Sequence, residues 1–215
     1  ERYGNYPVNL YTGLPTIEIP IYEIRVGALT VPVKLTYHAS GVKVNDQAGW
    51  TGLGWSLQAG GSITRSVIGK RDDEADGWMN RAFPVNLNSL TCAEYTDKAK
   101  DFFYDYHETG ADLFSFQSPS ASGKFIFENG STTAVKMVPF QKIPIQYHLE
   151  AKKFTLTDER GIVHEFAERE DLDTWHLRVL KGHSPQERID FNYFQAGISS
   201  SNMARNDFYT VYDQP

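Results

Sequence analysis

Apolar and polar residues alternate along much of this 215-residue chain, in short runs separated by Gly, Pro, Asn or Asp. The first two such runs are Thr16–Ile24 and Leu29–Tyr37, and Gly27-Ala28 lies between them. Alternation over a short stretch is typical of a half-buried β-strand, and two such runs joined by a glycine turn predict a hairpin. Because proline cannot donate to a β-ladder, we expect Pro20 and Pro32 at edges, bulges or unpaired positions.

The alternation continues to the end of the chain and predicts about eleven or twelve short strands in all. The later ones are Leu57–Ile68, Leu113–Gln117, Gly123–Glu128, Thr133–Val138, Phe154–Thr157, Ile162–Phe166, Trp175–Leu180, Glu187–Tyr193 and Asp207–Tyr212. Gly60-Gly61 interrupts the first of these and indicates a bulge or sharp bend. Successive strands of this kind predict an all-β, antiparallel fold, either a sandwich or an open barrel.

One segment departs from the alternation and predicts a single inserted amphipathic helix, roughly Thr91 to Tyr106. Thr91-Cys-Ala-Glu94 has the spacing of a capping box. Apolar residues then recur at helical spacing, at Tyr95, Ala99, Phe102, Phe103 and Tyr106. Cys92 is the chain's single cysteine, and we expect it to be a small buried side chain.

Composition limits the organisation of the chain and its partners. We expect one β-rich module spanning residues 1–215, with a division into 1–110 and 111–215 as the alternative. The chain opens at Glu1 without Met and closes just after a strand-like run, so we expect it to be a fragment of a longer protein. The net charge is −6 and the sequence has no Lys/Arg stripe, which predicts no nucleic-acid partner. No apolar run approaches the roughly 20 residues of a membrane span.

The most distinctive segment runs from Tyr37 to Arg65 and contains six glycines and two tryptophans. Glycine permits positive φ angles and close backbone approach, and tryptophan covers a large apolar area. We interpret the segment as a structural motif, with its tryptophans in the core, His38 as a buried hydrogen-bonding side chain and Arg65 as a donor to carbonyls or a carboxylate. Its members are Tyr37, His38, Gly41, Trp50, Gly52, Gly54, Trp55, Gly60, Gly61 and Arg65.

Several strings in and around this motif resemble the N-terminal region of bacterial RHS/YD-repeat proteins. They are Thr12-Gly-Leu-Pro15, Ile19-Pro-Ile-Tyr22, Leu35-Thr-Tyr-His-Ala-Ser-Gly41, Gly52-Leu-Gly-Trp-Ser-Leu57 and Ile63-Thr-Arg65. The last two are also similar to the start of the toxin-complex B component and of the virulence-plasmid B protein. Weaker similarities follow at Asp112–Phe116, Leu156–Gly161 and Ile189–Tyr193, whereas Met79–Gly110 departs from the family.

The resemblance implies a scaffold rather than an enzyme, with no cofactor. Family members are typically large secreted or surface proteins whose β-rich repeats wrap around and deliver a variable effector. By this analogy the chain starts or caps such a shell, and its partners are the YD repeats of its own polypeptide and another surface or delivery protein. Fold alone does not determine function, so this role is a hypothesis.

Two other functions are open from the sequence. A carbohydrate-binding β-sandwich would use an exposed aromatic platform built from Trp50, Trp78, Tyr104 or Tyr106. A glycoside hydrolase would need two facing carboxylates at a suitable separation. The candidates for that pair are Glu165, Glu168, Glu170, Asp171 and Asp173.

The acidic loop after the motif is a weak candidate for a calcium site. Asp72, Asp73 and Asp76 could supply the oxygen ligands that hard cations prefer. Their spacing does not match an EF-hand loop, and a solvated acidic loop is the alternative interpretation.

Overall fold

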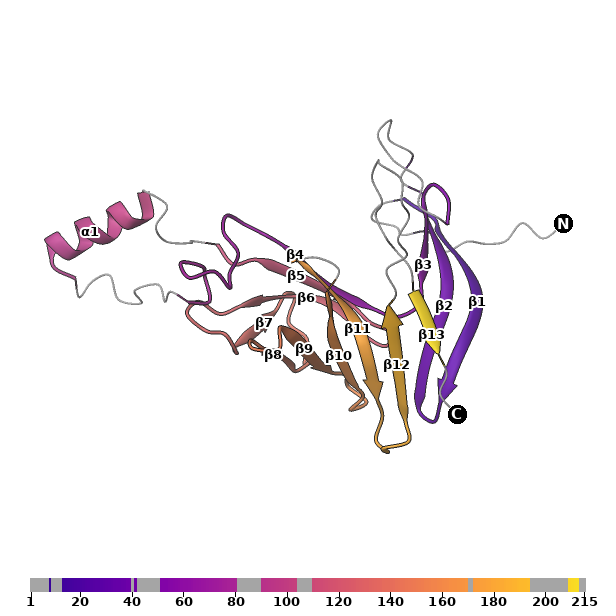
Figure 1. Ribbon diagram of the computed structural model, residues 1–215. Coiled ribbons are helices and arrows are strands. Elements are labelled where there is room, and N and C mark those ends of the chain that lie inside the picture. Colours follow the sequence, from indigo (N-terminus) through magenta and orange to yellow (C-terminus); the bar gives the residue numbers. More distant parts are fainter. Residues whose placement is uncertain are drawn as a thin grey trace, which may run out of the picture. The chain divides into compact units, whose positions relative to one another are not determined.

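The computed structural model describes residues 8, 13–39, 41, 51–80, 90–103, 110–169, 172–193 and 209–212. This part of the chain contains thirteen strands and one helix (Figure 1). The strand pairs are antiparallel, for example β1 with β2 and β4 with β5. The all-β, antiparallel fold with one inserted helix, predicted from the sequence, is confirmed.

The chain divides into two compact units. Residues 1–61 and 179–215 form one, called here the split unit, and residues 62–178 form the other, the continuous unit. Strand β4 (Ser62–Ser66) pairs with β5 (Leu113–Gln117), so residues on both sides of position 110 belong to one sheet. The division of the whole chain into folding domains stays a prediction.

The split unit contains a three-stranded sheet in the order β1-β2-β3. Its strands are β1 (Thr16–Val26), β2 (Leu29–His38) and β3 (Trp55–Gln58). The predicted hairpin of β1 and β2 is confirmed, and its register skips one residue between Pro20 and Tyr22. A proline at such an irregularity leaves the ladder intact elsewhere, which is the placement expected for Pro20.

The register gives this sheet one apolar and one polar face. Ile19 lies opposite Leu35, which lies opposite Leu57, so these three side chains share a face. His38 lies four residues after Lys34 on β2, so the two side chains are on the same face of the sheet. Lys34 forms an ion pair with Glu18 on β1, which makes this the polar face. The expectation of a buried His38 is wrong: its side chain is exposed, because it belongs to the polar face.

The described residues of the split unit also contain a second antiparallel ladder. Strand β11 (Thr174–Lys181) begins in the continuous unit, and its residues from Val179 onward pair with β12 (Arg188–Tyr193). Strand β13 (Tyr209–Tyr212) pairs with β12 on its other side, which confirms the last predicted strand within the described residues.

The continuous unit is built on a sheet in the order β7-β6-β5-β4-β11-β10-β9-β8, curved into a nearly closed barrel (Figure 1). The open barrel, one of the two predicted architectures, therefore describes this unit. Its further strands are β6 (Ser122–Phe127), β7 (Val135–Met137), β8 (Ile145–His148), β9 (Lys153–Thr157) and β10 (Val163–Arg169).

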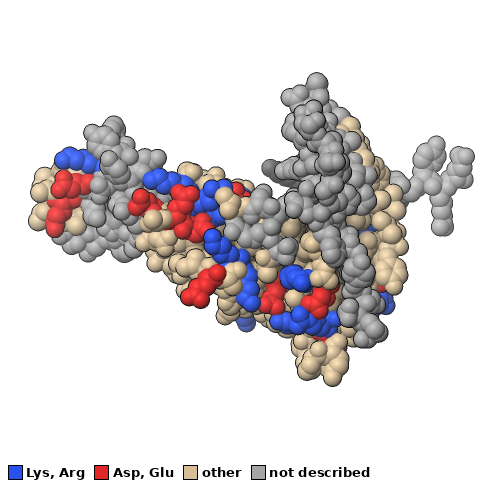
Figure 2. All heavy atoms as spheres, in the orientation of Figure 1, with Lys and Arg blue, Asp and Glu red and all other residues tan. Residues whose placement is uncertain are grey.

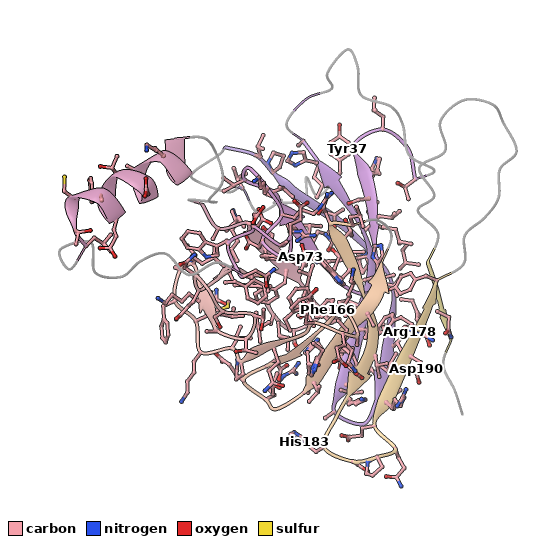
Figure 3. All side chains as sticks on the ribbon, turned by 60° about the vertical axis from the view of Figure 1, so that its left-hand side comes forward. Tyr37, Asp73, Phe166, Arg178, His183 and Asp190 are labelled. Carbon is pink, nitrogen blue, oxygen red and sulfur yellow. The ribbon has the colours of Figure 1, made fainter. Side chains whose placement is uncertain are left out.

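An aromatic core fills the interior of this curved sheet. The ring of Phe154 on β9 lies 5.0 Å from that of Trp175 on β11 and 5.7 Å from that of Phe125 on β6. Because β6 and β9 are far apart in the strand order, these contacts require the sheet to curl around a common interior. Phe166 on β10, labelled in Figure 3, and Phe114 on β5 are also buried.

Helix α1 spans Cys92–Phe103, and residues 104–106 of the predicted helix lie outside the described residues. The capping box is confirmed: the Thr91 amide donates to Glu94 at 2.8 Å, and the Glu94 amide donates to the Thr91 hydroxyl at 3.3 Å. The expectation for Cys92 is wrong, because this residue lies in a first turn whose side chains are all exposed. No helix within the described residues has the length and apolarity to cross a membrane.

Candidate functional site

The glycine- and tryptophan-rich motif forms a tight turn into β3. Gly52 and Gly54 have φ angles of 101° and 76°, values that favour glycine. The Trp55 amide donates to the Gly52 carbonyl at 3.3 Å, and the His38 amide donates to the Gly54 carbonyl at 2.8 Å. Trp55 is half-buried and lies 5.1 Å from the ring of Tyr37 on β2. The motif thus fixes β3 against β2, whereas Trp50 lies outside the described residues.

Gly54→Ala is expected to destabilise the protein by about 1–3 kcal/mol, because an L-residue is strained at this φ. A Cβ there would also lie 2.7 Å from an atom of the Tyr37 ring. Gly41→Ala is the matched control, since Gly41 has a φ of 90° and no atom of the described residues lies within 4 Å of a Cβ built on it. Urea unfolding should show a larger loss for Gly54→Ala; equal losses would contradict close packing of Tyr37 on the turn.

The last two glycines of the motif lie between two strands that belong to different sheets. Gly60 and Gly61 lie between β3, in the three-stranded sheet, and β4, in the barrel. The bend predicted there is confirmed. A Cβ on Gly60 would lie 3.4 Å from Phe191, within van der Waals reach of a buried side chain of the same unit.

Arg65, the last residue of the motif, is the centre of a buried ionic cluster in the continuous unit. Its side chain is only 2% exposed. It donates to Asp73 at 2.6 Å, to Asp173 at 3.0 Å and to the Leu172 carbonyl at 2.9 Å. Figure 3 labels Asp73 in this cluster. The cluster connects β4 to the loops before α1 and before β11, as expected for a structural donor.

The Arg65 guanidinium also covers one end of the aromatic core. Its central carbon lies 5.8 Å from the ring centroid of Phe114 and 5.5 Å from that of Trp175. A cation over aromatic faces is attracted by their quadrupoles, more strongly when it is desolvated. Arg65 is therefore held by charge, by hydrogen bonds and by packing at once.

Asp112 joins the cluster through a reciprocal pair of bonds with Asp72. The Asp72 amide donates to the Asp112 carboxylate and the Asp112 amide donates to the Asp72 carboxylate, both at 3.0 Å. The Ile68 amide adds a third bond to Asp112 at 2.8 Å. Burial raises the pKa of Asp112, although these amide donors and the charge of Arg65, 3.8 Å away, oppose the shift.

The pKa of Asp173 is shifted in the opposite direction to that of Asp112. Its hydrogen bonds from Arg71 and the charges of Arg65 and Arg71 lower its pKa, and burial opposes them only in part. A carboxylate with a lowered pKa stabilises the fold above its ordinary pKa, and this stabilisation is lost as the pH falls below that value.

The loop that carries Asp72 and Asp73 is anchored at its far end by Trp78. The indole N–H donates to the Phe127 carbonyl at 2.8 Å. The Trp78 carbonyl accepts from the Gly130 amide at 2.9 Å and from the Asn129 side chain at 3.1 Å. These bonds fasten the acidic loop to the turn between β6 and β7.

The acidic loop provides no metal centre among the described residues, where no group of three or more His, Cys, Asp or Glu side chains is placed to hold an ion. Of the predicted calcium ligands, Asp72 accepts the Asp112 amide and Asp73 accepts from Arg65. Asp76 lies in the same loop without joining such a group. In the structure the first two acids are structural acceptors.

The residues proposed for glycan binding or for glycoside hydrolysis either form contacts within the protein or lie outside the described residues. Trp78 is half-buried and bonded through its indole, and the other glycan-platform candidates Trp50, Tyr104 and Tyr106 lie outside the described residues. Among the acids proposed for hydrolysis, Glu165 pairs with Lys153 at 3.0 Å and Asp173 with the arginines. Glu170 and Asp171 are undescribed, as is the side chain of Glu168.

A second polar cluster, not predicted from the sequence, lies where the turns β5–β6 and β9–β10 meet. The Ser120 hydroxyl lies 2.6 Å from an Asp158 carboxylate oxygen and 3.1 Å from Nε2 of His164. Asp158 also accepts the amides of Arg160 and Ile162, both at 2.9 Å. Burial opposes ionisation of Asp158, but these donors and the nearby imidazole outweigh it, so its pKa is lowered.

The sequence indicates part of this cluster. His164 occupies an inward position of β10, two residues before the buried Phe166, and Asp158 opens the turn that ends at Gly161. A polar residue at an inward position must find a partner. The sequence does not reveal that the partner is Ser120, 44 residues away.

On the face shown in Figure 2, both Lys/Arg and Asp/Glu side chains are exposed among the described residues. Comparisons of the chain with protein-family models, with curated proteins and with solved structures found no match. The absence of a nucleic-acid partner and the resemblance to RHS/YD-repeat proteins stay predictions.

Proposed function

We propose that this chain is a non-catalytic structural module at the N-terminal side of a secreted or cell-surface RHS/YD-repeat-type protein, where it starts or caps a β-rich repeat shell. The main support is strand β13, which pairs with β12 and with no other described strand. An edge strand presents amides and carbonyls that a following strand can pair. The scaffold hypothesis predicts such an edge near the end of this chain.

The use of the buried charges also supports a structural role. Arg65 and its carboxylates connect loops to β4, and Ser120, Asp158 and His164 connect two turns. These side chains hold one another and main-chain groups. A catalytic pair would instead need to face a substrate.

The partners that follow from this role are the YD repeats of the same polypeptide and a second surface or delivery protein. The motif strings of residues 12–65 carry this part of the proposal, together with its secreted or surface location. The β-rich composition of both units is compatible with continuation into repeated hairpins.

Hydrogen exchange on β13 tests the proposal. In an antiparallel pair only alternate residues bond to a given neighbour, so the other β13 amides have no partner in β12. In a longer chain that includes the residues after position 215, those amides in Tyr209–Tyr212 should gain protection relative to the present chain. The edge strand β7 (Val135–Met137) is the control and should not change. Unchanged exchange in β13 would contradict continuation of the sheet.

A further inference from the structure

The geometry of the second polar cluster indicates which ring nitrogen of His164 donates a hydrogen bond. The Ser120 hydroxyl has one proton, and its 2.6 Å bond to Asp158 uses that proton because an ionised carboxylate only accepts. The 3.1 Å bond between Ser120 and His164 therefore needs the imidazole Nε2 to donate. Nδ1 is buried without a hydrogen-bond partner among the described residues. A proton on Nδ1 would have no acceptor there, so this geometry favours the neutral imidazole with a bare Nδ1.

The surroundings of His164 are mostly apolar. The side chain is 1% exposed, and Leu156 lies opposite it on β9. Asp158, whose oxygen is 3.6 Å from Nε2, is the nearest charged group and is shared with the exposed Arg160 at 3.6 Å. On the neighbouring strand β11 the buried titratable side chain is His176.

Protonation of His164 in its buried position is unfavourable for two reasons. Burial lowers the pKa of His164, and the charge of Arg160 adds to this, while Asp158 opposes them only in part. The added Nδ1–H would moreover be a buried donor without an acceptor, which carries the full desolvation penalty of that group. An imidazole that leaves the interior escapes both penalties.

We propose that His164 is an acid-operated latch that joins the β5–β6 turn to the β9–β10 turn at one end of the barrel. When the imidazole takes up a proton at Nδ1 it moves to solvent, and its bond to Ser120 is broken. The two turns, which come from separate parts of the strand order, are then released from each other. Loss of the proton allows the latch to close again. This device goes beyond the scaffold role and does not depend on it.

Hydrogen exchange at pH 7.5 and 5.5, corrected for intrinsic rates, measures the latch. The reporters are the Ala121 amide, bonded to Ser118 at 3.1 Å, and the Ile162 amide, bonded to Asp158 at 2.9 Å. If the open-state imidazole has an ordinary pKa of about 6.5, opening should increase as much as about tenfold at pH 5.5. Amides of the β1–β2 hairpin should show no such increase.

His164→Gln keeps a side-chain N–H donor but removes the titration, so its reporters should exchange alike at both pH values. His148→Gln is the matched control, because His148 is exposed on β8 of the same sheet and should leave the wild-type response intact. A response that persists in His164→Gln, or is absent from the wild type, would overturn the proposal. If His164→Gln does not fold, NMR titration of the wild-type imidazole decides: titration below about 6.5 together with the Ala121 amide supports the latch, and titration without it overturns it.

Discussion

Replacing Arg65 with alanine is expected to lower the free energy of unfolding by about 3–5 kcal/mol, one of the two largest effects of a single substitution in this protein. The side chain is 2% exposed and contacts Asp73 and Asp173 directly, with Asp112 at 3.8 Å. Its removal takes this cation away from the buried Asp112 and the half-buried Asp73, and leaves a void over Trp175. Urea unfolding followed by tryptophan fluorescence measures the loss.

Two comparisons separate this effect from a general loss of charge. Lys136→Ala breaks an exposed ion pair with Glu128 in the same sheet and should hardly change the unfolding midpoint. The Arg65→Ala deficit should also shrink on acidification, because Asp112 has a raised pKa and takes up a proton in the folded state. A deficit as small as that of Lys136→Ala would show that Arg65 is not the centre of the cluster.

Replacing Phe154 with alanine is expected to cost about 3–5 kcal/mol by opening a cavity in the barrel core. Phe154 is 0% exposed, and its ring lies 4.6 Å from that of Tyr147 and 5.0 Å from that of Trp175. Because these rings come from β8 and β11, the loss should weaken the contacts that keep the sheet curled. The midpoint in urea and the near-ultraviolet circular dichroism of the aromatic rings report it.

Phe140 provides a control with the same chemistry. It lies in the connection between β7 and β8 and is 87% exposed. Phe140→Ala should change stability by no more than about 0.5 kcal/mol. If Phe140→Ala and Phe154→Ala had similar effects, the aromatic core could not be what stabilises the curled sheet.

Much of the fold is predictable from the sequence because alternation reports which strand face is buried. Thr16–Ile24 and Leu29–Tyr37 were sufficient to predict the first hairpin, and the capping box predicts the start of α1. Strand β8 (Ile145–His148) is not predicted, since four residues after two nearby prolines give too short a pattern. The exposure of Cys92 depends on where the helix lies, which its own sequence does not contain.

The candidate site is predictable only in part, because its contacts are long-range. A donor role for Arg65 follows from its position in a strand, but its partner Asp173 is 108 residues away. The acidic loop has the composition of a cation site, yet Asp72 and Asp73 serve an amide and a guanidinium instead. Composition identifies groups that must be satisfied, and only tertiary structure shows what satisfies them.

The sequence of the parent reading frame on both sides of this chain tests the central claim most directly. The scaffold account predicts a secretory leader or other export signal upstream and tandem Tyr-Asp repeats immediately downstream of β13. A reading frame that ends soon after Pro215, or continues into sequence without such repeats, would contradict a role in starting a repeat shell.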